Sequence, residues 1–294
     1  MKSLYPFESH FLDLDGERYH YLDEGSGEVL LMVHGNPTWS FYYRNLVISL
    51  RDQYRVVVPD HIGCGYSDKP QHYSYTLQQH VENLTALISK LELNNITIFM
   101  HDWGGPISMG YAVEKPENVK HLIIFNTAAF WFPEIPLGLR MLKNSLIGSL
   151  FVRHFNLFAW SGILLASKKT MPQKVRSGYL KPYNSFKNRV AVLGFIKDIP
   201  LAENHESYPL LKDIEAKLSR LVDHKSIIIW GDKDPVFNLG FLNEWKYRFP
   251  GATVKVIEDA GHYVLEDGID QILPIVSDFL KNELPENSSL ENIK

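Results

Sequence analysis

The chain has 294 residues, with 45% hydrophobic and 22% charged residues, as expected of a soluble globular protein. Its 30 Lys and Arg residues and 34 Asp and Glu residues give a net charge of −4, which argues against nucleic acid as the main partner. The single cysteine, Cys64, excludes an internal disulfide and a Cys-rich zinc site. No stretch approaches the roughly 20 apolar residues of a membrane span, and no apolar signal sequence opens the chain, so we expect a cytoplasmic protein without a membrane span.

The first half of the chain alternates short apolar runs with helical patterns. The runs are rich in Val, Ile and Leu and are typical of strands buried on both faces of a parallel sheet; they cover residues 29–33, 54–58, 96–100 and 121–125. Apolar spacing predicts a helix over residues 77–91, and a second over residues 104–114 ends before Pro116. This alternation predicts an α/β fold with parallel strands.

The pattern changes at about residue 130. No convincing strand occurs before residue 221, and the intervening helical stretches are punctuated by prolines. Strand patterns return at residues 227–230 and 253–257, followed by a last helix over 271–280. A block of this length exceeds an ordinary loop. We therefore predict a core of residues 1–130 and 221–294 with an inserted helical cap, residues 131–220.

Chemically reactive residues follow several of the predicted strands. They occur in the tripeptides His34-Gly35-Asn36, His101-Asp102-Trp103, Asp232-Lys233-Asp234 and Ala260-Gly261-His262. Ligands of open α/β sheets bind beyond the carboxyl ends of the strands. These tripeptides therefore indicate one site at that edge of the sheet.

Asp102 occupies the nucleophile position of a strand-to-helix elbow. The elbow has the form Gly-x-nucleophile-x-Gly; here Met100 replaces the first glycine, and Gly104 and Gly105 follow the nucleophile. The alternative is that Asp102 only caps the next helix. The chain order of Asp102, Asp234 and His262 favours the catalytic interpretation, because it is the nucleophile, acid and histidine order of α/β hydrolases.

An aspartate nucleophile implies a two-step reaction. The carboxylate is ionised at neutral pH and suits attack on an alkyl carbon, with His262 then activating water against the ester and Asp234 orienting His262. Asp232 is a competing acid, although its place beside Gly231 suits a turn. Asn36 and Trp103 flank this chemistry and could bind a leaving halide or an oxyanion. The scheme requires no cofactor and no metal.

The sequence resembles the haloalkane dehalogenase family of α/β hydrolases over about residues 29–280. The motifs that carry the resemblance are residues 34–40, 60–70, 101–105, 232–234 and 259–262. The resemblance implies an α/β-hydrolase fold with an eight-stranded, mostly parallel sheet, helices on both faces and a helical cap. It implies conversion of halogenated alkanes to alcohol and halide. Asn36 and Asp234 together resemble one subgroup, which is also similar to the β-lactone decarboxylases of bacterial olefin synthesis.

Two further interpretations remain open. Epoxide hydrolases share the aspartate nucleophile and use cap tyrosines, for which Tyr179 and Tyr183 are candidates, but they carry an aromatic residue at the position of Asn36. A non-catalytic binding protein on the same fold is disfavoured by the complete catalytic set. Phe130 and Trp131 could line a substrate pocket or could pack the cap onto the core.

The expected substrate is a small apolar molecule, either a haloalkane or, as the alternative, a cis-3-alkyl-4-alkyl-β-lactone that yields an olefin and carbon dioxide. We expect a monomer or a small homo-oligomer. If the protein acts in an olefin pathway, we also expect it to belong to a multienzyme complex.

Overall fold

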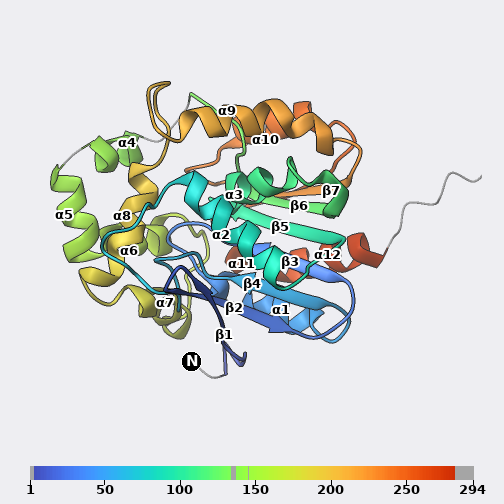
Figure 1. Ribbon diagram of the computed structural model, residues 1–294, viewed down its shortest axis with the longest axis horizontal. Helices are drawn as coiled ribbons and strands as arrows, with labels where there is room; N and C mark the ends of the chain where they lie inside the picture. Colours follow the sequence, from blue (N-terminus) through green and yellow to red (C-terminus); the bar gives the residue numbers. More distant parts are fainter. Residues whose placement is uncertain (1–2, 134–136, 145, 282–294) are drawn as a thin grey trace, which may run out of the picture.

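One eight-stranded sheet runs through the molecule in the order β1-β2-β4-β3-β5-β6-β7-β8 (Figure 1). The computed structural model describes residues 3–133, 137–144 and 146–281. β1 and β2 pair antiparallel with each other, β2 pairs antiparallel with β4, and every other neighbouring pair is parallel. The strands are β1 His10–Leu14, β2 Glu17–Glu24, β3 Val29–Val33, β4 Arg55–Pro59, β5 Ile96–Asp102, β6 Val119–Thr127, β7 Lys225–Gly231 and β8 Thr253–Ile257.

The six strands that the apolar runs predict are all present. β3 and β8 match the predicted bounds, whereas β5 and β6 extend beyond them, so that β5 ends on Asp102 itself. The hairpin of β1 and β2 does not form an apolar run in the sequence, because β1 has no buried residue and charged residues lie at both ends of β2. The fold is therefore the α/β-hydrolase architecture expected from the sequence.

Two helical layers enclose the sheet, because the side chains of each strand alternate between its faces. In β3, Val29, Leu31 and Val33 belong to one apolar cluster with α2, α3, α9 and α10, while Leu30 and Met32 belong to a second cluster with α1, α11 and α12. The layer helices are α1 Arg44–Leu50, α2 Leu77–Lys90, α3 Gly104–Ala112, α9 Tyr208–Lys217, α10 Leu239–Arg248, α11 Val264–Asp267 and α12 Ile269–Lys281.

Five helices form a cap at the end of the sheet where the parallel strands finish, on the left in Figure 1. They are α4 Leu137–Asn144, α5 Leu146–Phe155, α6 Leu157–Leu165, α7 Gln173–Leu180 and α8 Val190–Lys197. The next helix, α9, instead packs against α3 beside the sheet. Part of the range expected as cap, residues 131–220, thus belongs to the layer that covers the sheet.

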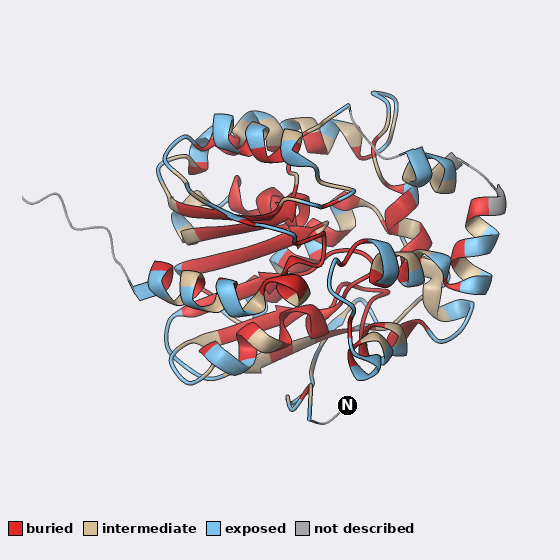
Figure 2. Ribbon diagram, turned by 180° about the vertical axis from the view of Figure 1, so that it is seen from behind, coloured by how far each residue is buried: buried red, intermediate tan, exposed pale blue. Residues whose placement is uncertain are grey.

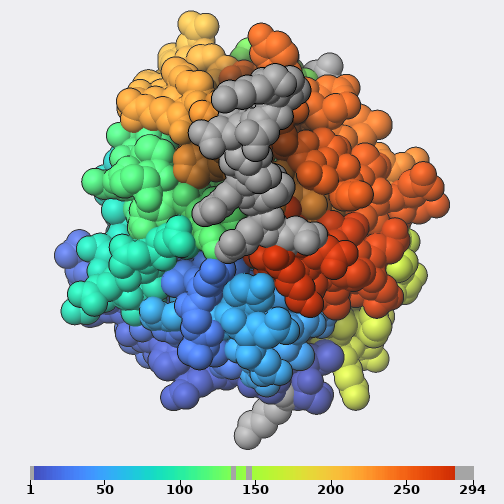
Figure 3. All heavy atoms as spheres, turned by 90° about the vertical axis from the view of Figure 1, so that its right-hand side faces the viewer, coloured from blue at the N-terminus to red at the C-terminus, as the bar shows by residue number. Residues whose placement is uncertain are grey.

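The opposite end of the molecule faces the viewer in Figure 3, where N-terminal segments in blue lie beside C-terminal segments in orange and red. Figure 2 shows that buried residues concentrate in the sheet and on the inner sides of the helices. Within the described residues, no helix combines the length and the apolar character needed to cross a bilayer.

Candidate active site

Asp102 lies at a sharp turn between β5 and α3. Its φ angle is 52°, in the left-handed region that non-glycine residues seldom adopt, as a nucleophile elbow requires. The Thr127 hydroxyl donates a hydrogen bond to the backbone carbonyl of Asp102 and holds the turn from the neighbouring strand. Gly104 allows this geometry, because a Cβ there would collide with the carbonyl of Val33.

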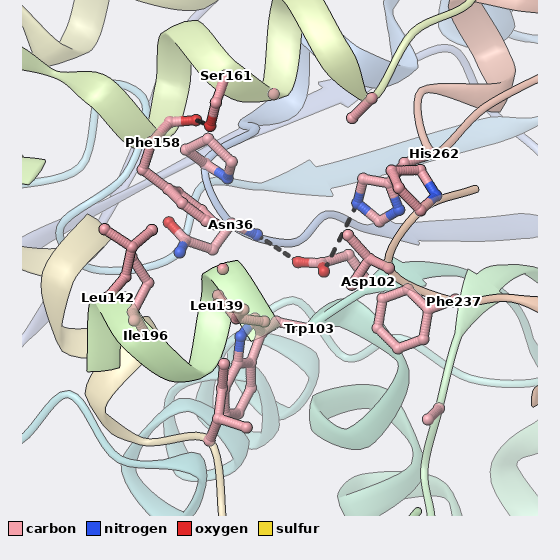
Figure 4. Close-up of a pocket in the computed structure, with 18 of the residues that line it drawn as sticks. Asn36, Asp102, Trp103, Leu139, Leu142, Phe158, Ser161, Ile196, Phe237 and His262 are labelled. Carbon is pink, nitrogen blue, oxygen red and sulfur yellow. Dashed lines mark hydrogen bonds and ion pairs between the residues drawn. The ribbon is translucent and has the colours of Figure 1, made fainter. Parts of the chain in front are cut away.

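Two backbone N–H groups hold the Asp102 carboxylate. The N–H of Asn36 donates to Oδ1 at 2.6 Å, and the N–H of Trp103 also donates to the carboxylate. Gly35 lies against Asp102 so closely that a Cβ at this position would overlap the carboxylate. The second oxygen, Oδ2, lies 3.6 Å from Nε2 of His262 (Figure 4). One carboxylate oxygen is thus fixed by the backbone, and the other faces the histidine.

The pKa of Asp102 lies above its ordinary value of 3.8. Burial is the main cause, because it penalises the charged form; His262 and the N–H groups of Trp103 and Asn36 oppose it by favouring the carboxylate. Burial also removes water from the carboxylate, so its remaining stabilisation comes from fixed protein groups.

His262 is oriented by Asp234. Its Nδ1 lies 2.8 Å from Oδ2 of Asp234, while Oδ1 of Asp234 accepts from the backbone N–H groups of Val236 at 2.6 Å and Phe237 at 3.0 Å. The Phe237 ring stacks on the imidazole at a centroid distance of 5.7 Å. The hydrogen bond to Asp234 leaves Nε2 directed towards Asp102.

The pKa of His262 lies above its ordinary value of 6.5. Burial alone would lower it, but the charge of Asp234, its hydrogen bond and the charge of Asp102 outweigh that effect. The neighbouring His101, buried and hydrogen-bonded to the carbonyl of His262, has a pKa held well below 6.5, chiefly by burial. Only one histidine of this pair therefore readily carries a proton.

The competing acid Asp232 lies outside the site. Its carboxylate pairs with Lys233 at 2.7 Å. Asp234, by contrast, is buried and contacts the imidazole. The structure therefore brings Asp102, Asp234 and His262 together as the sequence predicts and leaves Asp232 in the turn.

The side chains of Asn36 and Trp103 lie at the cavity beside Asp102. Asn36 Nδ2 donates to the carbonyl of Val192 in α8 at 3.1 Å, and its Oδ1 is buried without a hydrogen-bond partner among the described residues. The Trp103 ring packs against Phe195, with centroids 5.3 Å apart. One of the two N–H donors of this amide is thus engaged with the cap, which leaves the other for a ligand beside Asp102.

A cavity of about 750 Å³ lies between Asp102 and the cap (Figure 4). Such a volume suits a large ligand, since ligand pockets commonly span about 300–1,000 Å³. Phe130 and Trp131 both line it, as does Phe158 of α6. The polar groups at its inner end belong to the catalytic set, whereas its walls are mostly apolar.

Tyr179 and Tyr183 do not line this cavity, which corrects their assignment as pocket residues. The Tyr179 hydroxyl donates to Glu266 at 2.5 Å, and the Tyr183 hydroxyl donates to the carbonyl of Thr38 at 3.0 Å. Both rings are buried in the contact between cap and core. Neither hydroxyl is placed to protonate an epoxide beside Asp102.

Sequence reasoning missed three residues that position the site. Thr127 fixes the elbow and Phe237 stacks on His262, as described above. The buried Asp267 accepts hydrogen bonds from the backbone N–H groups of Gly261, Lys168 and Lys169, tying the His262 loop to the cap. The sequence offered only weak signals, because a threonine at a strand end and an acid in a short helix are common.

The arrangement is suited to covalent catalysis at a saturated carbon. Oδ2 of Asp102 can attack, while Oδ1 stays hydrogen-bonded to the N–H of Asn36. The N–H groups of Asn36 and Trp103 would stabilise charge on the ester. His262 can either activate water or, when protonated, stabilise the Asp102 carboxylate. The apolar cavity keeps the reacting carbon away from bulk water.

Comparison with known proteins identifies the family. Residues 28–269 match the family described as alpha/beta hydrolase fold. The chain is 44% identical to a cis-3-alkyl-4-alkyloxetan-2-one decarboxylase of Shewanella oneidensis, over 95% of this chain and 90% of the relative. It is 40% identical to the protein of the same name from Xanthomonas campestris, over 94% of this chain and 97% of the relative.

The chain is also 31% identical to haloalkane dehalogenase 2 of Mycobacterium bovis, over 92% of this chain and 93% of the relative. Among solved structures, the haloalkane dehalogenase DbeA of Bradyrhizobium elkani matches with a TM-score of 0.86 at 21% identity, over 93% of this chain and 97% of that chain. The resemblance to haloalkane dehalogenases is thus confirmed. The chain belongs to the α/β hydrolase family and is an enzyme related to both haloalkane dehalogenases and cis-3-alkyl-4-alkyloxetan-2-one decarboxylases.

Proposed function

We propose that the protein is a β-lactone decarboxylase that converts a cis-3-alkyl-4-alkyloxetan-2-one into an olefin and carbon dioxide, with Asp102 as the nucleophile. The two relatives at 44% and 40% identity carry that name. Identity to haloalkane dehalogenase 2 is lower, at 31%. The structural observation that supports a lactone with two alkyl chains is the cavity of about 750 Å³ with mostly apolar walls beside Asp102.

In the first step, Oδ2 of Asp102 attacks C4 of the lactone ring. A bond forms between this oxygen and C4, the bond between C4 and the ring oxygen breaks, and the ring carbonyl becomes a free carboxylate. The N–H of Asn36 continues to hold Oδ1, which is now the carbonyl oxygen of the ester, and the N–H of Trp103 stays beside the same group. No proton is transferred.

In the second step, the new carboxylate leaves as carbon dioxide. The electron pair of the broken carbon–carbon bond forms the double bond, and the bond between C4 and Asp102 breaks. Asp102 regains its negative charge, which the two N–H groups and protonated His262 stabilise. Inversion in the first step followed by anti elimination in the second turns a cis lactone into a cis olefin without consuming water.

Haloalkane dehalogenation is the second candidate, favoured by the 31% identity to haloalkane dehalogenase 2. It shares the attack by Asp102 but requires His262 to remove a proton from water in the second step. Esterification of Asp102 removes a negative charge beside His262 and lowers the pKa of the imidazole, which would favour that role. The two reactions therefore differ in the proton that His262 holds during the second step.

The test is a side-by-side assay of the full chain with a long-chain cis-β-lactone, 1-bromohexane and an alkyl epoxide. We expect olefin and carbon dioxide from the lactone and much slower halide release. The Asp102→Ala variant should lose at least about a thousandfold in rate with any substrate, because the covalent route disappears. Halide release faster than olefin formation would instead favour the second candidate.

The His262→Ala variant separates the two routes at the intermediate. With 1-bromohexane it should accumulate an alkyl ester on Asp102, visible as an increase in protein mass, because no base activates water. With the lactone it should form olefin more slowly, and any ester that accumulates should decay to olefin and carbon dioxide, because the ester can still eliminate without a base. Normal turnover of either substrate by this variant would contradict the role given to His262.

The proposal includes a cytoplasmic protein that is a monomer or a small homo-oligomer, and membership of a multienzyme complex if a preceding lactone-forming reaction supplies its substrate. The cap helices α4 to α8 would then enclose the alkyl chains. Size-exclusion chromatography of the purified chain and fractionation of cells would test these points.

A further inference from the structure

The charges of the chain are divided unequally between cap and core. Residues 137–197, here called the cap segment, contain eleven of the 30 Lys and Arg residues and none of the 34 Asp and Glu residues. The remaining 19 basic and 34 acidic residues give the rest of the chain a net charge of −15. Although the net charge of the whole chain is only −4, the cap segment is strongly cationic.

The cap cations lack carboxylate partners. No carboxylate lies within 4.0 Å of any of the eleven groups in the described part of the chain. Ten cationic residues of the core do form such pairs: Arg18, Arg44, Arg51, Arg55, Lys120, Lys212, Lys217, Arg220, Lys233 and Arg248. Four of the eleven, Lys143, Arg153, Lys181 and Arg189, donate to neutral oxygens of the protein. The cap therefore carries positive charge that no described carboxylate neutralises at contact distance.

The same segment exposes large apolar side chains. Figure 2 shows exposed positions in pale blue on the outer sides of the cap helices. Ten of the fifteen exposed large hydrophobic residues in the described chain belong to it: Leu137, Met141, Leu150, Phe151, Phe155, Leu157, Trp160, Leu164, Leu165 and Phe186. Leu165 is 69% exposed and Phe155 is 67% exposed. Extended apolar patches of this kind on a soluble protein mark interaction surfaces.

The exposed patch is continuous with the substrate cavity. Met141, Phe151, Leu157 and Leu165 are exposed at the surface and also line the cavity beside Asp102. The cavity therefore extends to the apolar, cationic face of the cap. An apolar molecule on this surface would have a continuous apolar route to the nucleophile.

We propose that the cap segment docks the protein on the surface of an anionic phospholipid bilayer, with the cavity directed towards the lipid. Leu, Phe and Trp flanked by Lys and Arg are the residues with which interfacial helices bind such surfaces. Lipid phosphates provide the anions that the cap cations lack, and the acyl region accepts the apolar side chains. An acidic protein partner would use the cations but would leave the breadth of apolar surface and its continuity with the cavity unexplained.

Flotation of the purified full-length protein with vesicles tests the proposal. We expect binding to vesicles of phosphatidylcholine mixed with phosphatidylglycerol, weaker binding to phosphatidylcholine alone, and loss of binding at high salt. The Arg140→Glu/Lys168→Glu/Lys169→Glu variant should bind about a hundredfold more weakly, at roughly fivefold for each lost cation. The Phe155→Ser/Leu164→Ser variant should also lose binding, although neither residue lines the cavity.

The matched control is Lys90→Glu/Lys115→Glu. Both lysines are exposed, Lys90 as the last residue of α2 and Lys115 just after α3, at the end of the sheet away from the cap. This variant should therefore bind like the unmodified chain. Asp102→Ala should also bind normally, which separates docking from the proposed reaction. Absence of flotation with anionic vesicles, or equal loss in the control, would overturn the proposal. So would vesicle-free dimerisation that Phe155→Ser/Leu164→Ser abolishes, because a second copy would then cover the patch.

Discussion

At the scale of single residues, the proton on His262 decides which reaction the site favours. Asp234 contacts Nδ1 and raises the pKa of the imidazole despite its burial, and Asp102 adds to this effect while it is charged. A protonated His262 stabilises the departing Asp102 carboxylate, whereas hydrolysis of an ester needs the neutral form. Protonation therefore links the geometry of the site to the choice between its two chemistries.

This link predicts the shape of the pH profile. For the lactone, kcat/KM should rise as Asp102 ionises, above pH 3.8, because burial raises the pKa of this carboxyl, and kcat should fall at higher pH as His262 loses its proton. The Asp234→Asn variant removes the strongest cause that raises the pKa of His262, so its falling limb should lie at lower pH. Steady-state kinetics across pH provide the measurement. A rate that only increases through this range would indicate the hydrolytic role of His262.

The catalytic residues could be predicted because their signals are local. Asp102, Asp234 and His262 follow strand ends in a characteristic chain order, and the sheet then brings strand ends together. The orientation of the Asn36 amide could not be predicted, because it depends on Val192, which lies 156 residues further along the chain. The hydrogen-bond partners of the Tyr179 and Tyr183 hydroxyls could not be predicted either, because they depend on how the cap packs on the core.

At the scale of elements, a buried ion pair joins the core to the cap. Arg44 of α1 contacts Glu266 of α11 through two hydrogen bonds, at 2.5 and 2.9 Å, and Tyr179 of α7 donates to the same carboxylate. The Arg44 and Glu266 side chains are only 3% and 9% exposed. One carboxylate thus fixes two core helices and one cap helix next to the His262 loop.

Glu266→Gln should therefore destabilise the protein more than loss of the Tyr179 hydrogen bond to Glu266 alone. We expect a loss of about 3 kcal/mol in the free energy of unfolding, because Arg44 keeps its buried charge without a charged partner. The matched variant Tyr179→Phe removes one hydrogen bond to a charged group and should lose about 1.5 kcal/mol. Urea titration measures both values. Equal losses in the two variants would show that the charge of Glu266 contributes little.

The sheet was easier to predict than the cap for a physical reason. Strands such as β3, Val29–Val33, are buried on both faces and appear as uninterrupted apolar runs. Cap helices have several partners and irregular apolar patterns, and their short connections contain prolines. The packing of α9 against α3 could not be separated from cap formation by sequence, because it is a property of the folded chain.

At the scale of the whole molecule, cap and core together enclose a cavity of about 750 Å³ whose length should set the chain-length preference. Ser161 of α6 lines this cavity (Figure 4). It lies far in the sequence from every catalytic residue. Its hydroxyl donates only to the carbonyl of Phe158 within the same helix. A larger side chain here would occupy space otherwise available to an alkyl chain.

Ser161→Phe should lower kcat/KM for a long-chain lactone by at least about tenfold, while a short-chain lactone stays within about twofold. Ser161→Ala removes the hydroxyl without filling the cavity and should leave the preference unchanged. Competition between lactones of different chain length, followed by olefin analysis, gives the ratio directly. An equal loss for short and long lactones would mean that this part of the cavity does not hold the alkyl chain.

The most direct test of the account is turnover of the cis-β-lactone in heavy-oxygen water, followed by mass analysis of the peptide that contains Asp102. The proposed route breaks the bond between Asp102 and the substrate carbon and uses no water. We therefore predict olefin and carbon dioxide with the mass of this peptide unchanged after many turnovers. Incorporation of heavy oxygen into Asp102 during lactone turnover would show hydrolysis of the ester by water and would contradict the proposed function.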